Sequence, residues 1–182
     1  MILGAMESHF DLPPSAWVQR WASSIRPGGA VLDVAAGSGR HARLLARLGF
    51  EVEAVDRDKS LFSDPPPNVV LLEADLEAGP WPYAGRRFDG IVVTNYLHRP
   101  LLPRLLDALE PGGMLIYETF AVGNERFGKP SNPAFLLAPG ELLEAVRGKL
   151  RVIAYEDLTV GEPKPAAVQR LAARREQDPA MG

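Results

Sequence analysis

Acidic residues and glycines follow two apolar runs near the start of this 182-residue chain. Asp33 lies in the run Ala30–Val34, Gly37 and Gly39 come next, and Asp56 ends a second run about twenty residues later. Glycine lets the backbone turn sharply and approach a ligand where a Cβ would intrude. A carboxylate at the end of a second strand can accept hydrogen bonds from ribose hydroxyls. The spacing predicts the first βαβ unit of a sheet that binds an adenosine cofactor.

Two cofactors fit this unit, because Gly37-x-Gly39-x-x-Ala42 also satisfies the dinucleotide fingerprint. Gly39 stands where a helix should begin, and the free N–H groups of a first turn attract a carboxylate or a phosphate. Asp33 separates the two cofactors. Its carboxylate would repel a pyrophosphate, whereas a methyl donor offers a cationic amino group and a sulfonium. Asp33 therefore favours S-adenosylmethionine over NAD.

The motif Asp33-x-Ala35-x-Gly37-x-Gly39 resembles the first motif of class I S-adenosylmethionine-dependent methyltransferases. Later segments follow the order of that family over nearly the whole chain. Glu73-Ala74-Asp75-Leu76 resembles the segment whose acid contacts adenine, Phe88–Asn95 resembles the fourth strand with its active-site end, and Glu110–Gly113 resembles the turn before the fifth strand. Within the family, the chain is most similar to the small group related to tellurite-resistance methyltransferases.

The first motif departs from the family pattern at Ala35, where these enzymes usually carry glycine. An alanine fits such a turn without strain if its φ angle is negative. Ala35 should therefore be tolerated if its φ is negative, and only the fine geometry of the turn depends on it.

The resemblance implies a Rossmann-like α/β fold with a seven-stranded, mostly parallel sheet, helices on both faces and a C-terminal antiparallel strand. It also implies S-adenosyl-L-methionine as the cofactor. Asp56 would bind the ribose and Asp75 the adenine amino group, with Leu76 supplying a backbone contact; for Asp75, helix capping is the alternative role. The full set of expected cofactor-binding residues is Asp33, Ala35, Gly37, Gly39, Asp56, Arg57, Asp75, Leu76 and Asn95.

Methyl transfer is an in-line displacement, so the protein must chiefly align the nucleophile with the methyl group and exclude water. A base is optional when the nucleophile is already anionic. Tyr96 and His98 follow the fourth strand and are the candidate proton acceptors, histidine being better matched to neutral pH. His98 could equally be a capping or surface residue before the helix that Pro100 begins.

Residues 121–138 show no periodic pattern, and structureless loops of this length are uncommon in compact domains unless they bind something. This segment is therefore a candidate active-site loop, with an ordinary solvent loop as the alternative. Arg126, a candidate catalytic residue, and Lys129 would suit an anionic acceptor by charge or by forked hydrogen bonds. The expected substrate is accordingly a small, anionic or soft nucleophile.

Hydrophobic periodicity and turn residues predict the remaining elements. A helix that starts near residue 40 should place His41, Leu44, Leu45 and Leu48 on the sheet. Helices are expected at about 14–25, capped by Ser15, at 58–62, from 100 to Gly112, and at 139–147. Strands are expected at about 30–34, 50–55, 69–73, 88–94, 114–120, 150–157 and 166–174.

Composition fits one globular domain, with 46% apolar and 24% charged residues. We therefore expect residues 1–182 to form a single cofactor-binding domain, in which residues 1–13 are an N-terminal arm that carries His9. The chain has no cysteine, and its three scattered histidines predict no metal site. A formal charge of -3 makes nucleic acid an unlikely partner, and basic clusters such as Arg170 with Arg174–Arg175 are expected to be solvated.

No apolar run is long enough for a membrane span, and the first residues lack the pattern of a secretion signal, so we expect a cytoplasmic protein. The expected partner is a small-molecule methyl acceptor, with no membrane; the oligomeric state is not predicted. Two other functions stay open. One is a non-catalytic module that binds S-adenosylmethionine, and the other is a small NAD-binding redox protein.

Overall fold

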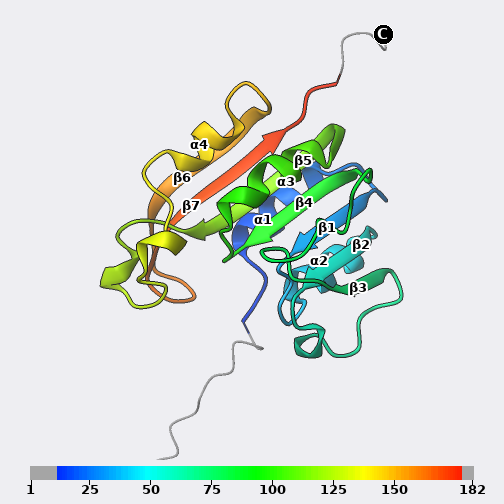
Figure 1. Ribbon diagram of the computed structural model, residues 1–182, viewed down its shortest axis with the longest axis horizontal. Helices are drawn as coiled ribbons and strands as arrows, with labels where there is room; N and C mark the ends of the chain where they lie inside the picture. Colours follow the sequence, from blue (N-terminus) through cyan, green and yellow to red (C-terminus); the bar gives the residue numbers. More distant parts are fainter. Residues whose placement is uncertain (1–11, 178–182) are drawn as a thin grey trace, which may run out of the picture.

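The computed structural model describes residues 12–177 and contains one seven-stranded sheet with the strand order β3-β2-β1-β4-β5-β7-β6 (Figure 1). The strand pairs among β1 to β5 are parallel, and β7 runs antiparallel to both β5 and β6. The predicted fold, a mostly parallel sheet with a C-terminal antiparallel strand, is confirmed. The strands are β1 (Ala30–Val34), β2 (Glu51–Asp56), β3 (Val69–Glu73), β4 (Phe88–Thr94), β5 (Leu109–Phe120), β6 (Arg151–Val160) and β7 (Ala166–Arg174).

Helices cover both faces of the sheet (Figure 1). Trp17 of α1 and Leu45 of α2 pack on one face, in a cluster that contains Val31. Leu105 of α3 and Leu142 of α4 belong to the cluster on the other face. The α-helices are α1 (Ala16–Trp21), α2 (Arg40–Arg47), α3 (Leu102–Asp107) and α4 (Glu141–Val146), and the 3-10 helices are Ala22–Ser24, Lys59–Leu61, Arg99–Leu101, Asn124–Arg126 and Pro133–Phe135.

Ser15 caps α1 as predicted, because its hydroxyl accepts hydrogen bonds from the amides of Trp17 and Val18. The helix is shorter than expected and ends at Trp21, after which the chain tightens into a 3-10 turn. The indole of Trp17 anchors the helix by donating to the Leu171 carbonyl of β7 at 3.1 Å.

The helix after the glycine turn, α2, buries a narrower stripe than its leucines suggested. His41, Ala42, Leu45 and Ala46 are its buried residues, whereas Leu48 is 51% exposed. Leu48 lies beyond the last helical residue, as the C-cap, so the helical spacing no longer directs its side chain to the sheet. The expectation that Leu48 packs on the sheet was wrong.

Strand β3 has its predicted bounds and forms one edge of the sheet, where Val70 is 60% exposed. Strand β5 begins at Leu109 instead of residue 114, because Leu109 pairs with Phe88 of β4 and not with the helical face of α3. The Pro-Gly-Gly turn expected between helix and strand is therefore part of an irregular strand.

The chain order places a topological switch between β1 and β4. From β1 the chain winds outward to β2 and β3, and it then returns to the other side of β1 with β4 and β5. In such sheets, ligands bind beyond the carboxyl ends of the strands at this point. Within residues 12–177, no helix is long and apolar enough to cross a membrane.

Candidate active site

A cavity of about 380 Å³ lies at the carboxyl ends of the first strands, within the size range of small-molecule sites. Six residues expected to bind cofactor or act in catalysis come together in its lining: Ala35, Asp56, Arg57, Asp75, Leu76 and Tyr96. Ala74, Glu77 and Phe135 complete the lining. Residues that were predicted from segments far apart in the chain thus lie around one cavity.

The turn between β1 and α2 is left-handed at three positions. The φ angles of Gly37 and Gly39 are 55° and 80°, as the glycine pattern predicted. Ala35 has a φ of 54°, so the condition for an unstrained alanine is not met. An alanine in this region is strained because its Cβ approaches the backbone. Gly39 has a second constraint, since the ring of Phe62 lies 2.3 Å from the place of a Cβ.

Asp56 stands at the end of β2 and holds the turn in place. Its Oδ2 accepts a hydrogen bond of 2.8 Å from the Gly37 amide, and its Oδ1 accepts one of 3.0 Å from the Asp58 amide. Each carboxylate oxygen has two lone pairs, so Asp56 keeps acceptor capacity for hydroxyl donors. It can therefore organise the turn and bind a ligand at the same time.

Asp75 follows β3 and lines the same cavity. Its Oδ1 accepts hydrogen bonds from the amides of Glu77 and Ala78 at 2.9 and 3.0 Å. These bonds lower the pKa of the Asp75 carboxyl, so it is ionised at neutral pH. The helix-capping role considered for Asp75 is not found, because residues 76–78 form a turn and not a helix. The ionised carboxylate holds this turn and also lines the cavity.

Asp33 lies below the turn, with 1% of its surface exposed. Neither carboxylate oxygen has a hydrogen-bond partner within the described residues. Burial raises the pKa of Asp33 to about 7, against the opposing effects of the nearby Ala42 amide and the charge of Arg40. A buried carboxylate without a partner is costly, and a cationic or hydrogen-bonding ligand group would relieve that cost. Asp33 does not line the cavity itself.

A second cavity of about 250 Å³ adjoins the first, because Glu77, Tyr96 and Phe135 line both. It lies where β4 and β5 end and the 121–138 segment begins. Its other lining residues are Asn95, Leu97, Thr119, Phe120 and Pro130. Asn95 has a φ of 53° and donates its backbone N–H to the Glu118 carbonyl at 2.9 Å, so the chain turns into this cavity directly after β4.

The two candidate proton acceptors after β4 differ in their surroundings. Burial raises the pKa of the Tyr96 phenol, and the charges of Glu77, Asp75 and Asp56 act in the same direction. Tyr96 is therefore a neutral phenol at physiological pH. His98 occupies the N-cap position of a 3-10 helix without a capping side-chain bond, and it lines neither cavity.

Arg126 lies outside both cavities. Its Nε donates to the Gly123 carbonyl at 3.4 Å, and the side chain is exposed at the surface of the loop. Lys129 is exposed as well and lines neither cavity. The structure therefore does not bring the two basic residues of the loop to the other candidate site residues.

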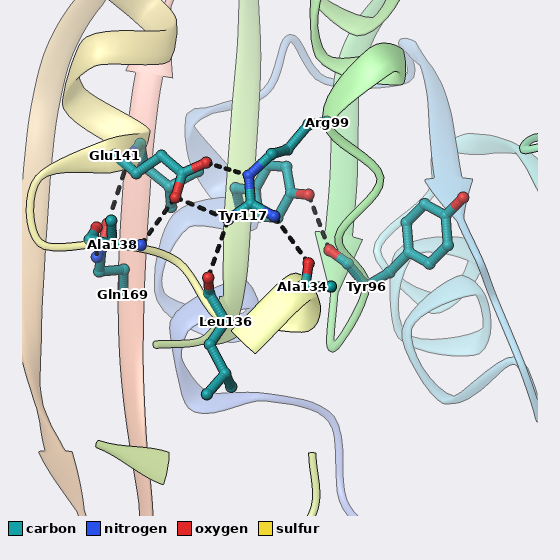
Figure 2. Close-up of polar contacts among 9 residues, drawn as sticks. Tyr96, Arg99, Tyr117, Ala134, Leu136, Ala138, Glu141 and Gln169 are labelled. Carbon is teal, nitrogen blue, oxygen red and sulfur yellow. Dashed lines mark hydrogen bonds and ion pairs between the residues drawn. The ribbon is translucent and has the colours of Figure 1, made fainter. Parts of the chain in front are cut away.

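Arg99 anchors the 121–138 segment to the end of β4 (Figure 2). Its Nη1 and Nη2 donate to the carbonyls of Ala134 and Leu136 at 2.7 and 2.9 Å, and its Nε contacts the Glu141 carboxylate at 2.6 Å. Glu141 also accepts from the Ala138 amide at 2.8 Å. This network fixes the backbone on both sides of Phe135, which lines both cavities.

Two further bonds connect this anchor to the sheet (Figure 2). Gln169 of β7 donates to the Ala138 carbonyl at 2.6 Å, and the Tyr117 hydroxyl of β5 donates to the Tyr96 carbonyl at 2.8 Å. The loop and the residue after β4 are thus held by neighbouring strands. The segment is therefore built into the fold, unlike an ordinary solvent loop.

His41 has satisfied bonds, in agreement with the packing role expected for it. Its Nε2 accepts from the Ser15 amide at 3.0 Å, and its Nδ1 lies 3.1 Å from the Thr94 hydroxyl. Burial lowers the pKa of His41 to about 3, so the ring is neutral. Arg170, expected in a solvated cluster, instead pairs with Glu118 and Glu156. His9 and most of the N-terminal arm lie outside the described residues.

Sequence reasoning missed Glu77, Phe135 and Arg99. Glu77 stands only two residues after Asp75, so proximity to a predicted site residue could have suggested it. Phe135 lies in the segment already suspected, whereas nothing in the pattern around Arg99 indicates that it binds backbone 35 residues away. Among residues 12–177, no group of three acidic, histidine or cysteine residues is placed to hold a metal ion.

Residues 31–113, a little under half of the chain, match the family described as a methyltransferase domain. The fold is the Rossmann-like fold that class I S-adenosylmethionine-dependent methyltransferases share.

Curated relatives share about a third of the aligned residues. A ubiquinone/menaquinone biosynthesis C-methyltransferase of Ectopseudomonas mendocina is 31% identical over 61% of this chain and 46% of its own length. A protein-L-isoaspartate O-methyltransferase of Methylorubrum extorquens is 32% identical over 58% of this chain and 53% of its own. The chain thus spans about half the length of these relatives.

Solved structures support the fold over most of the chain. TehB from Haemophilus influenzae superposes with a TM-score of 0.70 at 19% identity, covering 87% of this chain and 61% of that one. The glycopeptide N-methyltransferase MtfA in complex with S-adenosyl-L-homocysteine has a TM-score of 0.64 at 21% identity, covering 91% of both chains. At this level of identity the likeness concerns the fold alone.

Proposed function

We propose that this chain is a methyltransferase that binds S-adenosyl-L-methionine in the first cavity and a small methyl acceptor in the second. The observation that carries the proposal is the joined pair of cavities, with acidic residues at the ends of β2 and β3 on one side and aromatic residues after β4 and β5 on the other. The family match over residues 31–113 and the fold agree with it.

The residues of the first cavity suit the parts of this cofactor. Asp56 would accept from the ribose hydroxyls, and Asp75 would accept from the adenine amino group, with the backbone of Leu76 beside it. The unpaired carboxylate of Asp33 would be compensated by the cationic amino group or by a water that it binds. When bound, the cofactor supplies an electrophilic methyl group on a sulfonium. The role of the chain is alignment and exclusion of water.

The nature of the acceptor is a finer proposal. The prediction of an anionic acceptor was based on Arg126 and Lys129. These two residues line neither cavity, so they do not support it. A soft, uncharged nucleophile needs no cation and stays compatible with the site. The kinship with tellurite-resistance methyltransferases rests on the likeness in fold to TehB, and the cytoplasmic location and the single domain remain predictions.

A non-catalytic module that binds the same cofactor is the second candidate. It is favoured by the neutral state of the Tyr96 phenol, which leaves carboxylates as the only general bases in the described lining of the joined cavities. An NAD-binding protein is disfavoured by Asp33, because the carboxylate below the turn would repel a pyrophosphate.

Calorimetric titration with S-adenosylmethionine, S-adenosylhomocysteine and reduced NAD tests the proposal. We expect micromolar binding of the first two ligands and no heat from the third. Binding followed by methylation of any acceptor would exclude the non-catalytic module. Silence from both sulfur compounds together with saturable heat from NAD would overturn the cofactor assignment.

A further inference from the structure

The second cavity has an unusual combination of wall groups. Glu77 is the one charged residue in its lining, as far as residues 12–177 show. Three rings surround the space, from Tyr96, Phe120 and Phe135. Asn95 and Thr119 add an amide and a hydroxyl, so the walls contain hydrogen-bonding groups without any positive charge.

The basic side chains near the cavity are engaged elsewhere or lie apart from it. The Arg99 guanidinium donates its hydrogen bonds to Glu141 and to two loop carbonyls. Arg126 turns back to the Gly123 carbonyl, and Arg57 lines the first cavity only. An anionic acceptor would therefore meet the Glu77 carboxylate with no basic side chain in the described lining to compensate it, which works against binding.

A positively charged group finds the opposite situation. The faces of aromatic rings attract an ammonium through their quadrupole, and a carboxylate attracts it directly. The same rings, together with Leu97 and Pro130, offer apolar surface to the body of a ligand. The combination of one carboxylate and several rings is that of a site for an amine on an apolar body.

We propose, on the basis of the proposed methyl transfer, that the acceptor is a small amine with an aromatic or apolar body, bound in the second cavity with its nitrogen toward Glu77. The walls then serve two purposes. The rings hold the body of the acceptor, and the carboxylate selects for a group that enters as a cation.

The amine has to lose a proton before it can attack. A nearby sulfonium disfavours a second positive charge, so the ammonium releases a proton to the Glu77 carboxylate and from there to solvent. The nitrogen lone pair then forms the bond to the methyl carbon, and the bond from that carbon to sulfur breaks with its electron pair left on sulfur. The methylated ammonium that results can lose a further proton to solvent.

Matched ligands that differ in charge test this inference. We would titrate the protein with 2-phenylethylamine, 2-phenylethanol and 3-phenylpropanoate, with and without saturating S-adenosylhomocysteine. The same titrations would use Glu77→Gln, which removes the charge at similar size. Glu51→Gln is the matched control, because Glu51 is an exposed residue at the opposite end of β2.

We expect the amine to bind at least about tenfold more tightly than the carboxylate, a difference of about 1.4 kcal/mol, with the alcohol between them. Glu77→Gln should reduce this preference to less than about threefold, while Glu51→Gln should preserve it. Equal or absent binding of amine and carboxylate, or a preference that survives Glu77→Gln, would overturn the inference. If the wild-type protein did not bind S-adenosylhomocysteine but still preferred the amine, the proposed cofactor would be overturned and the inference about the acceptor would stand.

Discussion

The Asp56 carboxylate bonds directly to the Gly37 amide, with 2.8 Å between Oδ2 and the nitrogen. This bond joins the end of β2 to the turn that follows β1, the two segments expected to hold opposite sides of a bound nucleoside. Asp56 thus holds the turn, and the proposed function also gives it the ribose hydroxyls to bind. Its removal should affect the shape of the turn as well as the contacts made with a cofactor.

Replacement of this residue gives the first prediction. Asp56→Ala should weaken binding of S-adenosylmethionine by about 30- to 150-fold, because the lost hydrogen bonds amount to about 2 to 3 kcal/mol. Calorimetry measures the change. Asp58→Ala is the control, since Asp58 is exposed and lies outside the first cavity lining. Unchanged affinity in Asp56→Ala, or an equal loss in Asp58→Ala, would contradict the ribose assignment.

The strained turn gives the second prediction. Ala35 has a φ of 54°, a conformation in which alanine has a strain energy of about 1 to 2 kcal/mol and glycine has none. Glycine costs about 0.5 to 1 kcal/mol more in unfolded-state entropy, so Ala35→Gly should stabilise the protein by roughly 0.5 to 1 kcal/mol. This corresponds to a rise of about 1 to 4 °C in melting temperature.

Scanning calorimetry of the cofactor-free protein would measure this rise. Ala36→Gly is the matched control, because Ala36 is buried and has no positive φ, so this change should lower the melting temperature. If Ala35→Gly were destabilising by as much as Ala36→Gly, the left-handed conformation of Ala35 would be in doubt.

The sequence predicted the features that depend on local order. Asp56 and Asp75 could be found because each ends or follows a strand, and parallel strands place their carboxyl ends on one edge. The φ of Ala35 could not be read from the sequence, because the residue type favours a negative angle, whereas the bonds that impose the turn come from β2. Leu48 was misplaced because the helical period was extended beyond the last residue of the helix.

The rest of the site depends on contacts between distant segments. Arg99 and Glu141 are 42 residues apart, and neither stands in a pattern typical of ligand binding. Their pairing decides where Phe135 lies, and it follows from the packing of α4 against the sheet. Arg126 shows the converse, because a basic residue in a promising loop satisfied the charge argument while its side chain turned back on its own backbone.

Two buried groups, Asp33 and His41, give a third prediction, because their pKa shifts have opposite effects on stability. His41 has a folded pKa of about 3, against an ordinary value of 6.5. The contribution of His41 to the free energy of unfolding is complete above pH 6.5. This contribution falls by about 1.4 kcal/mol per pH unit as the pH decreases toward 3. Asp33 has a folded pKa of about 7, against an ordinary value of 3.8. Its contribution is complete below pH 3.8 and is lost at a similar rate as the pH rises to 7.

Between pH 4 and 6.5 the two effects should nearly cancel, so a variant is needed to reveal them. Asp33→Asn removes the carboxyl titration. Relative to the wild type, its free energy of unfolding should therefore rise by roughly 2 to 3 kcal/mol between pH 4.5 and 6.5. His41→Gln should change by a similar amount in the opposite direction. Urea unfolding of the cofactor-free proteins at pH 4.5, 5.5 and 6.5 measures both, and parallel curves for all three proteins would rule out the shifts.

The anchor of the 121–138 segment gives the last prediction. Arg99→Lys keeps the charge and removes the forked bonds to Glu141, Ala134 and Leu136. Because the Arg99 side chain is 42% exposed, the loss in global stability should stay below about 1 kcal/mol. The loop amides should nevertheless exchange at least about tenfold faster, since their opening no longer breaks these bonds. Acceptor binding should also weaken, because Phe135 would be held less firmly.

Hydrogen exchange with mass spectrometry measures the faster exchange of the loop amides. Arg147→Lys is the control, because Arg147 pairs only with Glu144 on the exposed side of α4. Equal exchange in the wild type and Arg99→Lys would mean that the other contacts of the segment, such as those of Leu137 and Ala138, hold it without Arg99.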